Sequence, residues 1–432
     1  MKSPPRRLGA GWWALLAVLL VTFAGQVLHA SHERTGIDFH CNWAGGQHLK
    51  HHGADDLYSF EGRQRLAARE AAAAQASGDE RRLRAVEVQA RLYPEGLRTV
   101  GTPFLFTLMS RYDGVDYLAE LQQFQTRSLV AVVVGLAFAA RALGASGATL
   151  GLLLLFLLSS YQPLLADGGV ANVNRFQVGA VGLAVWLAGG GRVRLALAGV
   201  VLGLVTMAKP NVGLVAVLLV VAQLLGGRTK AAVALTAGGA LGAFVALAWS
   251  ALAGAGPDAW VAWLGSVGGV GEVSPLSDRN YALGLVTDHW LGVDASLPAW
   301  LLVLGWVGVG LLRRRGLTTS RGRVAWALAG GAGLVLLAAP LAWGHYFLGL
   351  VPACLWLLRP EVRFRHQLLA VLGLLATSNP AAFVASAFGL DAAQAWATPE
   401  VGGLLAQLGV LFVLAGVAGA LATRSPRSAR SP

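Results

Sequence analysis

The chain has 432 residues, of which 55% are hydrophobic and 13% are charged, and its formal net charge is +12. A soluble domain carries about 25% charged residues, so a chain this long with half that share cannot cover a water-soluble surface. The composition excludes a soluble globular fold and an intrinsically disordered chain. It predicts an all-α, polytopic membrane protein.

The first apolar run, residues 11–30, follows the basic residues Arg6 and Arg7. A signal peptide has the same order of charged and apolar residues, and Ala30-Ser31 is small enough for cleavage. Because many further apolar runs follow, we expect a retained membrane-spanning helix.

Eleven more apolar runs follow the first. Several are shorter than the roughly 20 residues that a straight span needs, and short helices are tolerated where they line a cavity within the protein. With the first helix they predict about twelve spans in one transmembrane domain. We expect the segment 99–111, which is too short to span, to be interfacial or re-entrant. The runs lie near 118–142, 145–162, 174–190, 194–208, 211–226, 231–253, 298–312, 324–340, 346–358, 367–388 and 402–422.

Short basic loops alternate along the chain with longer acidic or polar ones. By the positive-inside rule, the basic loops, the N-terminus and the basic tail 423–432 are cytoplasmic. The other loops, 31–117, 163–173, 254–297 and 389–401, then face outward. We therefore expect a multi-pass protein of the cell (inner) membrane. The net charge is a signal of topology and does not indicate nucleic acid as a partner.

The outer loop 31–117 is the largest segment outside the membrane. Its middle, about 61–92, is rich in Ala, Glu, Arg and Gln and predicts a helical hairpin broken near Gly78. Ser77 and Glu80 have the spacing of a capping box for the second helix. Acceptor docking and a solvated spacer are both open as roles for the hairpin.

Polar clusters next to apolar spans are candidates for function because charge is costly in a membrane. Asp38 follows the first span, where neighbouring apolar residues can tune a carboxylate for base chemistry. The alternative is an ordinary loop aspartate. Lys209 is one of only four lysines and precedes Pro210 between two spans. It suits a point-charge contact to phosphate, although lysines at helix ends also snorkel without function.

Two further clusters precede or interrupt spans. Asn172 and Asn174 lie at the head of a span, where they suit either sugar hydroxyls or helix capping. Pro340 breaks a late span just before Trp343, His345 and Tyr346. An interfacial aromatic belt explains the Trp and the Tyr but not the His. Histidines 48, 51 and 52 are spaced for a metal ion, but no further ligands complete that site, and we expect no metal and no cofactor.

In their order along the chain, these motifs resemble the bacterial multi-pass glycosyltransferases of family 87, in the C-type superfamily that uses polyprenyl-phosphate sugars. The resemblance covers nearly the whole chain. It rests on Asp38-Phe39 after the first helix, Tyr93-Pro94 at the end of the first loop, Asn172 and Asn174 before a span, a glycine-rich helix ending in Lys209-Pro210, Asp278-Arg279-Asn280-Tyr281 in an outer loop, and Pro340-Leu341-Ala342-Trp343-Gly344-His345-Tyr346. The chain departs from the family pattern at Ala339, at Tyr281-Ala282 and in the hairpin, which looks like an insertion.

The resemblance implies a helical bundle of the C-type glycosyltransferase kind. It also implies transfer of a hexose, most often mannose, from a polyprenyl-phosphate donor to a glycan or glycolipid acceptor at the outer, periplasmic membrane face. Asp38 would be the general base of an inverting reaction, and no cofactor would be needed. The candidates for the donor phosphate are Lys209, Arg279 and His345. The candidates for the sugar or the lipid are Asn172, Asn174, Asn280, Trp343 and Tyr346.

Two other functions remain open. A transporter or flippase of lipid-linked sugars has a similar number of spans, but it places ionisable groups near the middle of the bilayer. Here the middle of each apolar run is nearly free of charge. A polysaccharide polymerase or ligase also works on lipid-linked sugars at the outer face, and the Lys-Pro and Trp-x-His-Tyr motifs favour a single-sugar transferase over it.

Overall fold

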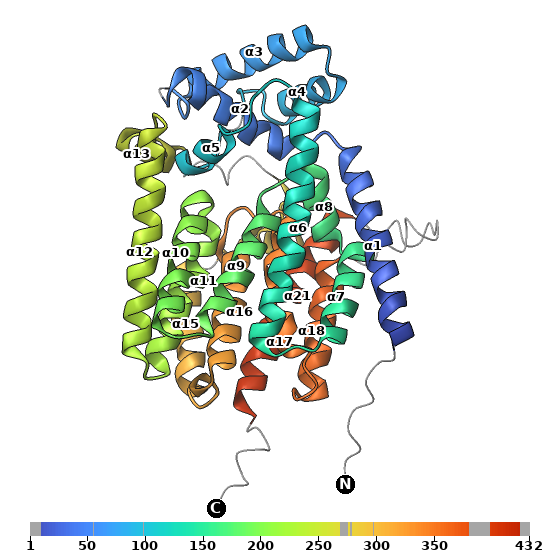
Figure 1. The fold of residues 1–432 in the computed structure, drawn as a ribbon, viewed down its shortest axis with the longest axis vertical. Helices are drawn as coiled ribbons and strands as arrows, with labels where there is room; N and C mark the ends of the chain where they lie inside the picture. Colours follow the sequence, from blue (N-terminus) through green and yellow to red (C-terminus); the bar gives the residue numbers. More distant parts are fainter. Residues whose placement is uncertain are drawn as a thin grey trace, which may run out of the picture.

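The computed structural model describes residues 10–54, 56–97, 99–267, 275–276, 279–296, 298–379 and 398–423 of the chain. Within these ranges the protein is helical, with one isolated β-bridge between Asn280 and Trp343. The helices form an upright bundle, and a layer of helices that we call the cap (residues 37–109) lies across one end (Figure 1). Asp278, positions 55 and 98 of the loop 31–117, and parts of four further predicted segments, 254–297, 367–388, 389–401 and 423–432, lie outside the described residues.

Every predicted apolar run overlaps a helix of the bundle. The helices are α1 (Ala10–His32), α6 (Tyr117–Leu143), α7 (Gly147–Ser160), α8 (Gln162–Val170), α9 (Asn174–Ala188), α10 (Arg192–Ala208), α11 (Gly213–Leu225), α12 (Thr229–Leu252), α15 (Ala299–Leu312), α16 (Ser320–Ala338), α17 (Val351–Leu357), α18 (Phe364–Thr377) and α21 (Pro399–Ala422). Short 3-10 helices, η1 (Pro210–Val212), η4 (Gly316–Thr318) and η5 (Gly344–Leu350), connect some of them.

Four of the described helices are long and apolar enough to cross a membrane: α1, α6, α12 and α21. A fifth span results if α7 and α8, which meet at a bend of 57°, are counted together. Several other apolar helices, such as α11 with 13 residues, are shorter than the roughly 20 residues of a straight span. The prediction of an all-helical membrane protein agrees with this fold, but the count of twelve spans is not confirmed.

Glycines allow the bundle helices to approach one another closely. A Cβ atom on Gly199 of α10 would lie 2.1 Å from the carbonyl oxygen of Leu235 in α12, and one on Gly238 of α12 would lie 1.9 Å from that of Ala196. The two backbones are therefore in direct contact. Small residues serve this purpose in membrane helix pairs, where packing replaces the hydrophobic driving force.

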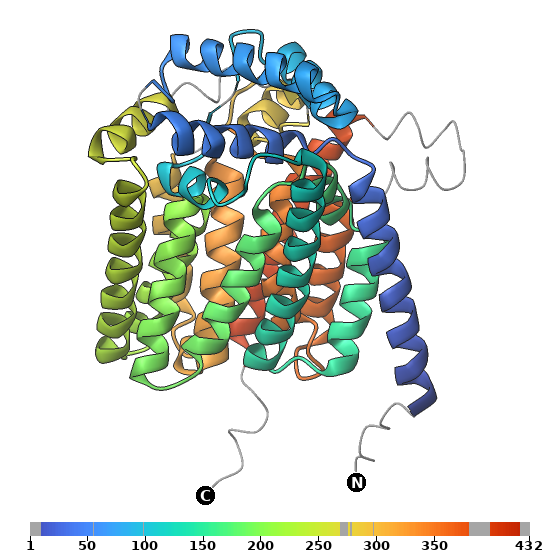
Figure 2. The same cartoon turned by 45° about the horizontal axis from the view of Figure 1, so that its top comes forward.

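The cap contains α2 (Ile37–His52), α3 (Phe60–Ser77), α4 (Glu80–Leu92) and α5 (Pro103–Met109). Helix α2 runs across the end of the bundle, and the hairpin of α3 and α4 lies outside it (Figure 2). Helix α2 is not expected from the sequence, since its apolar residues show no clear helical periodicity. Asp38 lies in the first turn of this helix.

The start of α4 differs from the capping box predicted at Ser77 and Glu80. The N-cap is Asp79, whose carboxylate accepts hydrogen bonds from the backbone N–H groups of Arg81 and Arg82. Ser77 ends α3 instead. The prediction is wrong because Asp79 directly precedes the helix, where a carboxylate reaches two unpaired N–H groups and interacts favourably with the helix dipole.

A buried charged cluster joins the hairpin to α2. Arg82 donates a hydrogen bond of 2.9 Å to the Glu70 carboxylate, and His40 Nε2 lies 3.6 Å from the same carboxylate oxygen. The Arg82 guanidinium also lies 4.8 Å from the ring centroid of Trp43. Burial by itself raises the pKa of the Glu70 carboxyl, but His40 and Arg82 outweigh burial and hold that pKa below its ordinary value.

The turn between α1 and α2 depends on Gly36, whose φ is 62°. An L-residue in this left-handed conformation is destabilised by about 1–2 kcal/mol. A Cβ atom at this position would also lie 2.4 Å from Leu121 Cδ1 in α6. The turn therefore requires glycine, and it sets the position of Asp38 two residues later.

The Glu70→Gln variant should be less stable than the wild type by about 3–5 kcal/mol, because it leaves the buried Arg82 cation unpaired. Ionised Glu70 stabilises the wild type fully above its ordinary pKa, and this stabilisation is lost as the pH falls through the lowered pKa. The Tm of the wild type in detergent should therefore fall more steeply than that of Glu70→Gln between about pH 6 and about pH 3. Parallel Tm profiles would contradict this role of Glu70.

The Gly36→Ala variant should lose more stability than the ~1–2 kcal/mol of backbone strain, because the new methyl group also overlaps Leu121. Gly78→Ala is the matched control. Gly78, the C-cap of α3, has the same left-handed conformation with a φ of 66°, and nothing lies within 4 Å of the position that a Cβ atom would take there, so it isolates the strain. Thermal unfolding of the two variants measures the difference. Equal losses would show that Leu121 makes room without cost.

Candidate functional site

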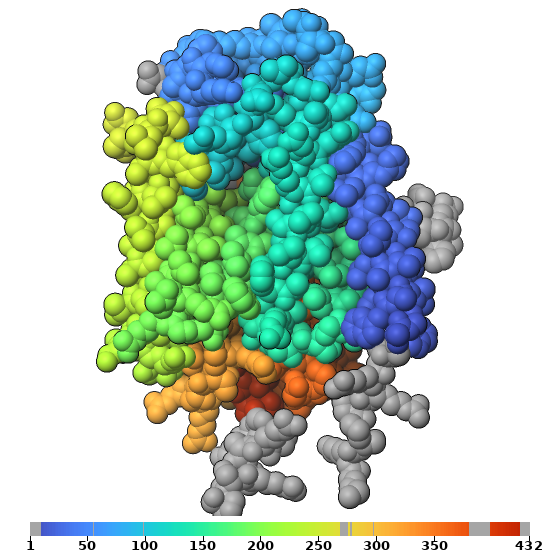
Figure 3. Space-filling view, viewed as in Figure 1, coloured from blue at the N-terminus to red at the C-terminus, as the bar shows by residue number. Residues whose placement is uncertain are grey.

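A cavity of about 670 Å³ lies where the cap meets the bundle. On the cap side its wall comes from α2, α4 and the segment before α5. On the bundle side it comes from α8, the loop before α9, the end of α10 and the segment 341–346. The surface is recessed beneath the cap, between α6 and α10 (Figure 3).

Seven of the nine candidate site residues line this cavity. Asp38 enters from α2, Lys209 from the C-terminal end of α10, and Asn172 from the loop between α8 and α9. The cavity thus brings together motifs that are far apart in the sequence. The seven are Asp38, Asn172, Lys209, Arg279, Trp343, His345 and Tyr346.

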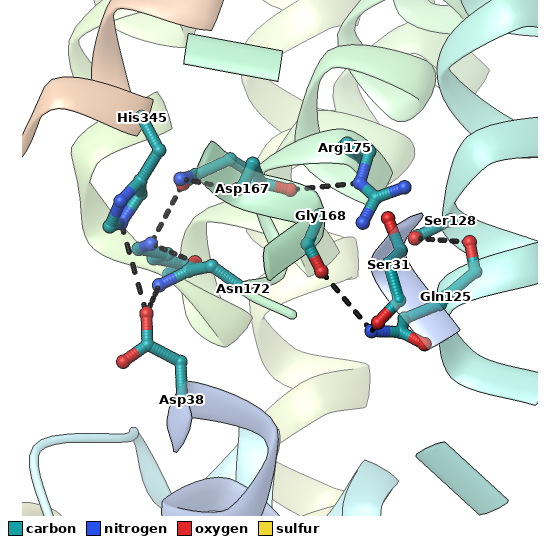
Figure 4. A network of polar contacts seen from close by, with 11 residues as sticks. Ser31, Asp38, Gln125, Ser128, Asp167, Gly168, Asn172, Arg175 and His345 are labelled. Carbon is teal, nitrogen blue, oxygen red and sulfur yellow. Dashed lines mark hydrogen bonds and ion pairs between the residues drawn. The ribbon is translucent and has the colours of Figure 1, made fainter. Parts of the chain in front are cut away.

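A chain of hydrogen bonds connects the candidate base to the candidate cation. The Asn172 side-chain amide donates to Asp38 Oδ2 at 2.6 Å. Lys209 Nζ donates to Asn172 Oδ1 at 2.6 Å and to Asn174 Oδ1 at 2.8 Å. The two asparagines therefore hold the ammonium group between their carbonyl oxygens. Asn172 also holds the Asp38 carboxylate (Figure 4).

His345 and Tyr346 complete the surroundings of these groups. His345 Nε2 lies 3.8 Å from Asp38 Oδ2, the same oxygen that Asn172 contacts. Lys209 Nζ lies 4.4 Å from the centroid of the Tyr346 ring, a cation–π contact. Both residues belong to the 3-10 helix η5, which follows the end of the helix near Pro340. The imidazole of His345 therefore lies beside Asp38, and the ring of Tyr346 lies beside Lys209.

The side chain of Asn280 makes hydrogen bonds to backbone groups beside the cavity. Its side chain accepts hydrogen bonds from the backbone N–H groups of Ala342 (2.8 Å) and Ala282 (3.3 Å), and it donates to the Pro340 carbonyl at 3.2 Å. It is fully buried and does not line the cavity. Asn280 therefore holds the segment that carries Trp343 and His345, and its side chain lies outside the cavity lining.

Asn174 does not line the large cavity, but its side-chain oxygen accepts a hydrogen bond from Lys209 Nζ. Arg279, by contrast, is exposed and lines the cavity, and its φ is 65°. The asparagines 172 and 174 were open to a helix-capping role. The N-cap of α9 is Val173, and no side chain caps this helix, so both amides are used in the polar network instead.

Two charged residues of the network were missed by the sequence analysis. Asp167 in α8 and Arg175 in α9 are fully buried, and Arg175 Nε donates to Asp167 Oδ2 at 3.0 Å. Asn174 donates to the other oxygen of Asp167 at 2.9 Å. Asp167 and Arg175 flank the Asn-rich motif eight positions apart, a spacing that could indicate an ion pair, but the loop pattern places Asp167 in the outward-facing loop 163–173.

The geometry provides a carboxylate, an ammonium group and an imidazole around one water-accessible space. Such a set can remove a proton from a hydroxyl group and stabilise a negatively charged leaving group. Within the described part of the chain, no three His, Cys, Asp or Glu residues come together in the manner of a metal site.

No protein-family model, curated protein or solved structure matches this chain.

The two cysteines test the position of the cavity. Cys41 lines it one turn of α2 beyond Asp38 and is 9% exposed, whereas Cys354 in α17 is completely buried. A water-soluble maleimide should therefore modify Cys41 in the native protein, and Cys354 only after denaturation. Mass spectrometry of the wild type and of Cys41→Ser and Cys354→Ser variants measures both rates. Equal native rates would place the opening elsewhere.

Proposed function

We propose that this protein is a membrane hexosyltransferase. It moves a hexose, with mannose as the first candidate, from a polyprenyl-phosphate sugar to an acceptor hydroxyl on a glycan or glycolipid. The observation that carries the proposal is the meeting of Asp38, Lys209 and His345 at one cavity at the end of an apolar helical bundle. The resemblance of the sequence motifs to glycosyltransferase family 87 supports the same chemistry.

The proposal includes an arrangement in the membrane. About twelve spans, several of them short, would form a C-type bundle with the cap and the cavity on the outer, periplasmic face. The end of the bundle opposite the cap carries basic residues such as Arg141, Arg192 and Arg313. The positive-inside rule would place this end and both termini in the cytoplasm of a cell whose inner membrane holds the protein.

In the proposed reaction, Asp38 removes the proton from the acceptor hydroxyl as its oxygen attacks the anomeric carbon of the donor sugar. The bond from this carbon to the phosphate oxygen breaks, and the configuration at the carbon inverts. The departing lipid phosphate gains negative charge. Lys209 is the cation closest to Asp38 in the hydrogen-bonded chain, and Arg279 lines the same cavity; together they would stabilise that charge.

The surroundings of Asp38 suit a base. Its side chain is 31% exposed, so that a hydroxyl in the cavity has access to it. Asn172 donates a hydrogen bond to its Oδ2 atom and orients the carboxylate, and His345 Nε2 lies 3.8 Å from the same oxygen. The side chains of Trp343 and Tyr346 line the cavity and offer apolar faces for a sugar or a prenyl chain.

A transporter or flippase of lipid-linked sugars is the second candidate function. The observation that favours it is the bend of 57° between α7 and α8, with the buried Asp167–Arg175 ion pair beside it. Broken helices and buried charges mark substrate sites in transporters. A polymerase or ligase acting on lipid-linked sugars needs the same base and cation, and the identity of the acceptor separates it from a single-sugar transferase.

The Asp38→Asn variant tests the base. The amide keeps the size of the side chain but has no negative charge with which to take a proton. Transfer from a polyprenyl-phosphate hexose by the purified protein in liposomes should fall by about 10²–10⁴-fold. Thin-layer separation of labelled products measures the rate, and the Tm shows whether the variant is folded.

Asp258→Asn is the matched control, because Asp258 is an exposed acid in α13 (Pro257–Val267) that does not line the cavity. This variant should transfer at the wild-type rate. Transfer at the wild-type rate by folded Asp38→Asn would remove Asp38 as the base. Movement of the labelled lipid across the liposome membrane without any new glycosidic bond would favour the transporter.

A further inference from the structure

The Asp167–Arg175 ion pair lies outside the cavity lining, and no step of the proposed reaction uses it. Both side chains are completely buried in the apolar bundle. A buried ion pair is weak evidence for stability, because apolar side chains of similar volume often stabilise a protein as well or better. Stability of the fold therefore does not by itself explain why these two charged residues are buried here.

The side chain of Asp167 determines which way Asn174 faces. An asparagine amide has one acceptor and one donor end. Because Asn174 Nδ2 donates to Asp167 Oδ1, its carbonyl oxygen is turned toward Lys209 Nζ. Asn172 is oriented in the same way by Asp38, to which its amide donates while its carbonyl accepts from Lys209. Each carboxylate thus turns one amide oxygen toward the ammonium group.

The backbone of Asp167 organises the same loop. Its carbonyl oxygen accepts hydrogen bonds from the N–H groups of Ala171 and Asn172. Ala171 has a φ of 53°, a left-handed conformation that is strained for alanine. This conformation ends α8 and turns the chain so that Asn172 lines the cavity. One residue therefore positions both asparagines, one through its backbone and the other through its side chain.

Arg175 keeps the Asp167 carboxylate in place, and Gln125 of α6 holds the backbone of α8. Gln125 of α6 donates to the carbonyl oxygens of Ser31 in α1 (2.8 Å) and Gly168 in α8 (3.1 Å). Figure 4 shows this contact next to the ion pair. The end of α8 is thus fixed by α1, α6 and α9 together.

We propose that Asp167, held by Arg175, is a positioning residue for Lys209 and acts on it through Asn174. The inference rests on the proposed function in one respect, namely that Lys209 is the cation that meets the donor phosphate. Lys209 Nζ has three N–H bonds, and two of them point to the asparagines. With those two directions set, the orientation of the whole ammonium group is set, and the donor phosphate meets a cation of defined geometry.

The test is the chemical reactivity of Lys209 in the protein without substrate. Reductive methylation with formaldehyde and borohydride, quantified by peptide mass spectrometry, reports how freely each lysine amine moves and loses its proton. Lys50 and Lys230 are exposed and serve as internal standards. Asp167→Leu combined with Arg175→Met removes both charges together, so that no unpaired ion remains buried.

In this double variant, the methylation rate of Lys209 relative to the standards should rise about threefold or more, as expected when one member of a hydrogen-bonded network is removed. Asp167→Glu keeps both charges but displaces the carboxylate by one methylene, and it should raise the rate as well. Arg323→Met removes a buried arginine of α16, which donates to the carbonyl oxygens of Leu317 and Thr318 and has no contact with Lys209, and it should leave the rate unchanged.

An unchanged rate for Lys209 in the folded double variant and in Asp167→Glu would overturn the positioning role. An equal rise in Arg323→Met would also overturn it, since general loosening would then be the cause. Sugar transfer is measured in parallel, with the donor KM expected to rise and the acceptor KM to stay constant. If the wild type transfers no sugar, the proposed function fails, while the methylation rates still decide whether Asp167 positions Lys209.

Discussion

Lys209 places a positive charge at the end of an apolar helix, and the organisation of the cavity depends on how this charge is stabilised. Two asparagine oxygens accept its hydrogen bonds, and a carboxylate lies behind each asparagine. One carboxylate faces the cavity and the other is buried beside an arginine. Opposite charges in this low-dielectric region are therefore linked through neutral amides, which separate the base from the cation without leaving either unpaired.

The two layers of the molecule contribute different parts of this arrangement. The bundle is built from close helix contacts at glycine, and it supplies Lys209, Asn172 and His345. The cap is held by polar and charged contacts such as Glu70–Arg82, and it supplies Asp38. Since the base and the cation come from different layers, the chemistry that we propose depends on how the cap is seated on the bundle.

Backbone strain is concentrated at the same place. The described residues include four non-glycine residues with positive φ, of which Arg279 and Asn379 line the cavity and Ala171 directly precedes a lining residue. Each such conformation is destabilising by about 1–3 kcal/mol and persists only where the surroundings hold it. Asn280, which anchors the segment from Pro340 to Ala342, shows how tightly those surroundings are bonded. The strain therefore agrees with a cavity whose polar groups are held in set positions.

The sequence by itself determined the helical membrane class, the positions of the apolar helices and the motifs at their ends, because composition and hydrophobic runs are local properties. It also identified seven residues that line one cavity. Only the tertiary structure decided the rest. The pairing of Asp167 with Arg175, the bonding of Asn280 to a distant segment and the seat of α2 on the bundle each depend on contacts between helices. Such contacts follow from packing in three dimensions, which residue type and spacing do not reveal.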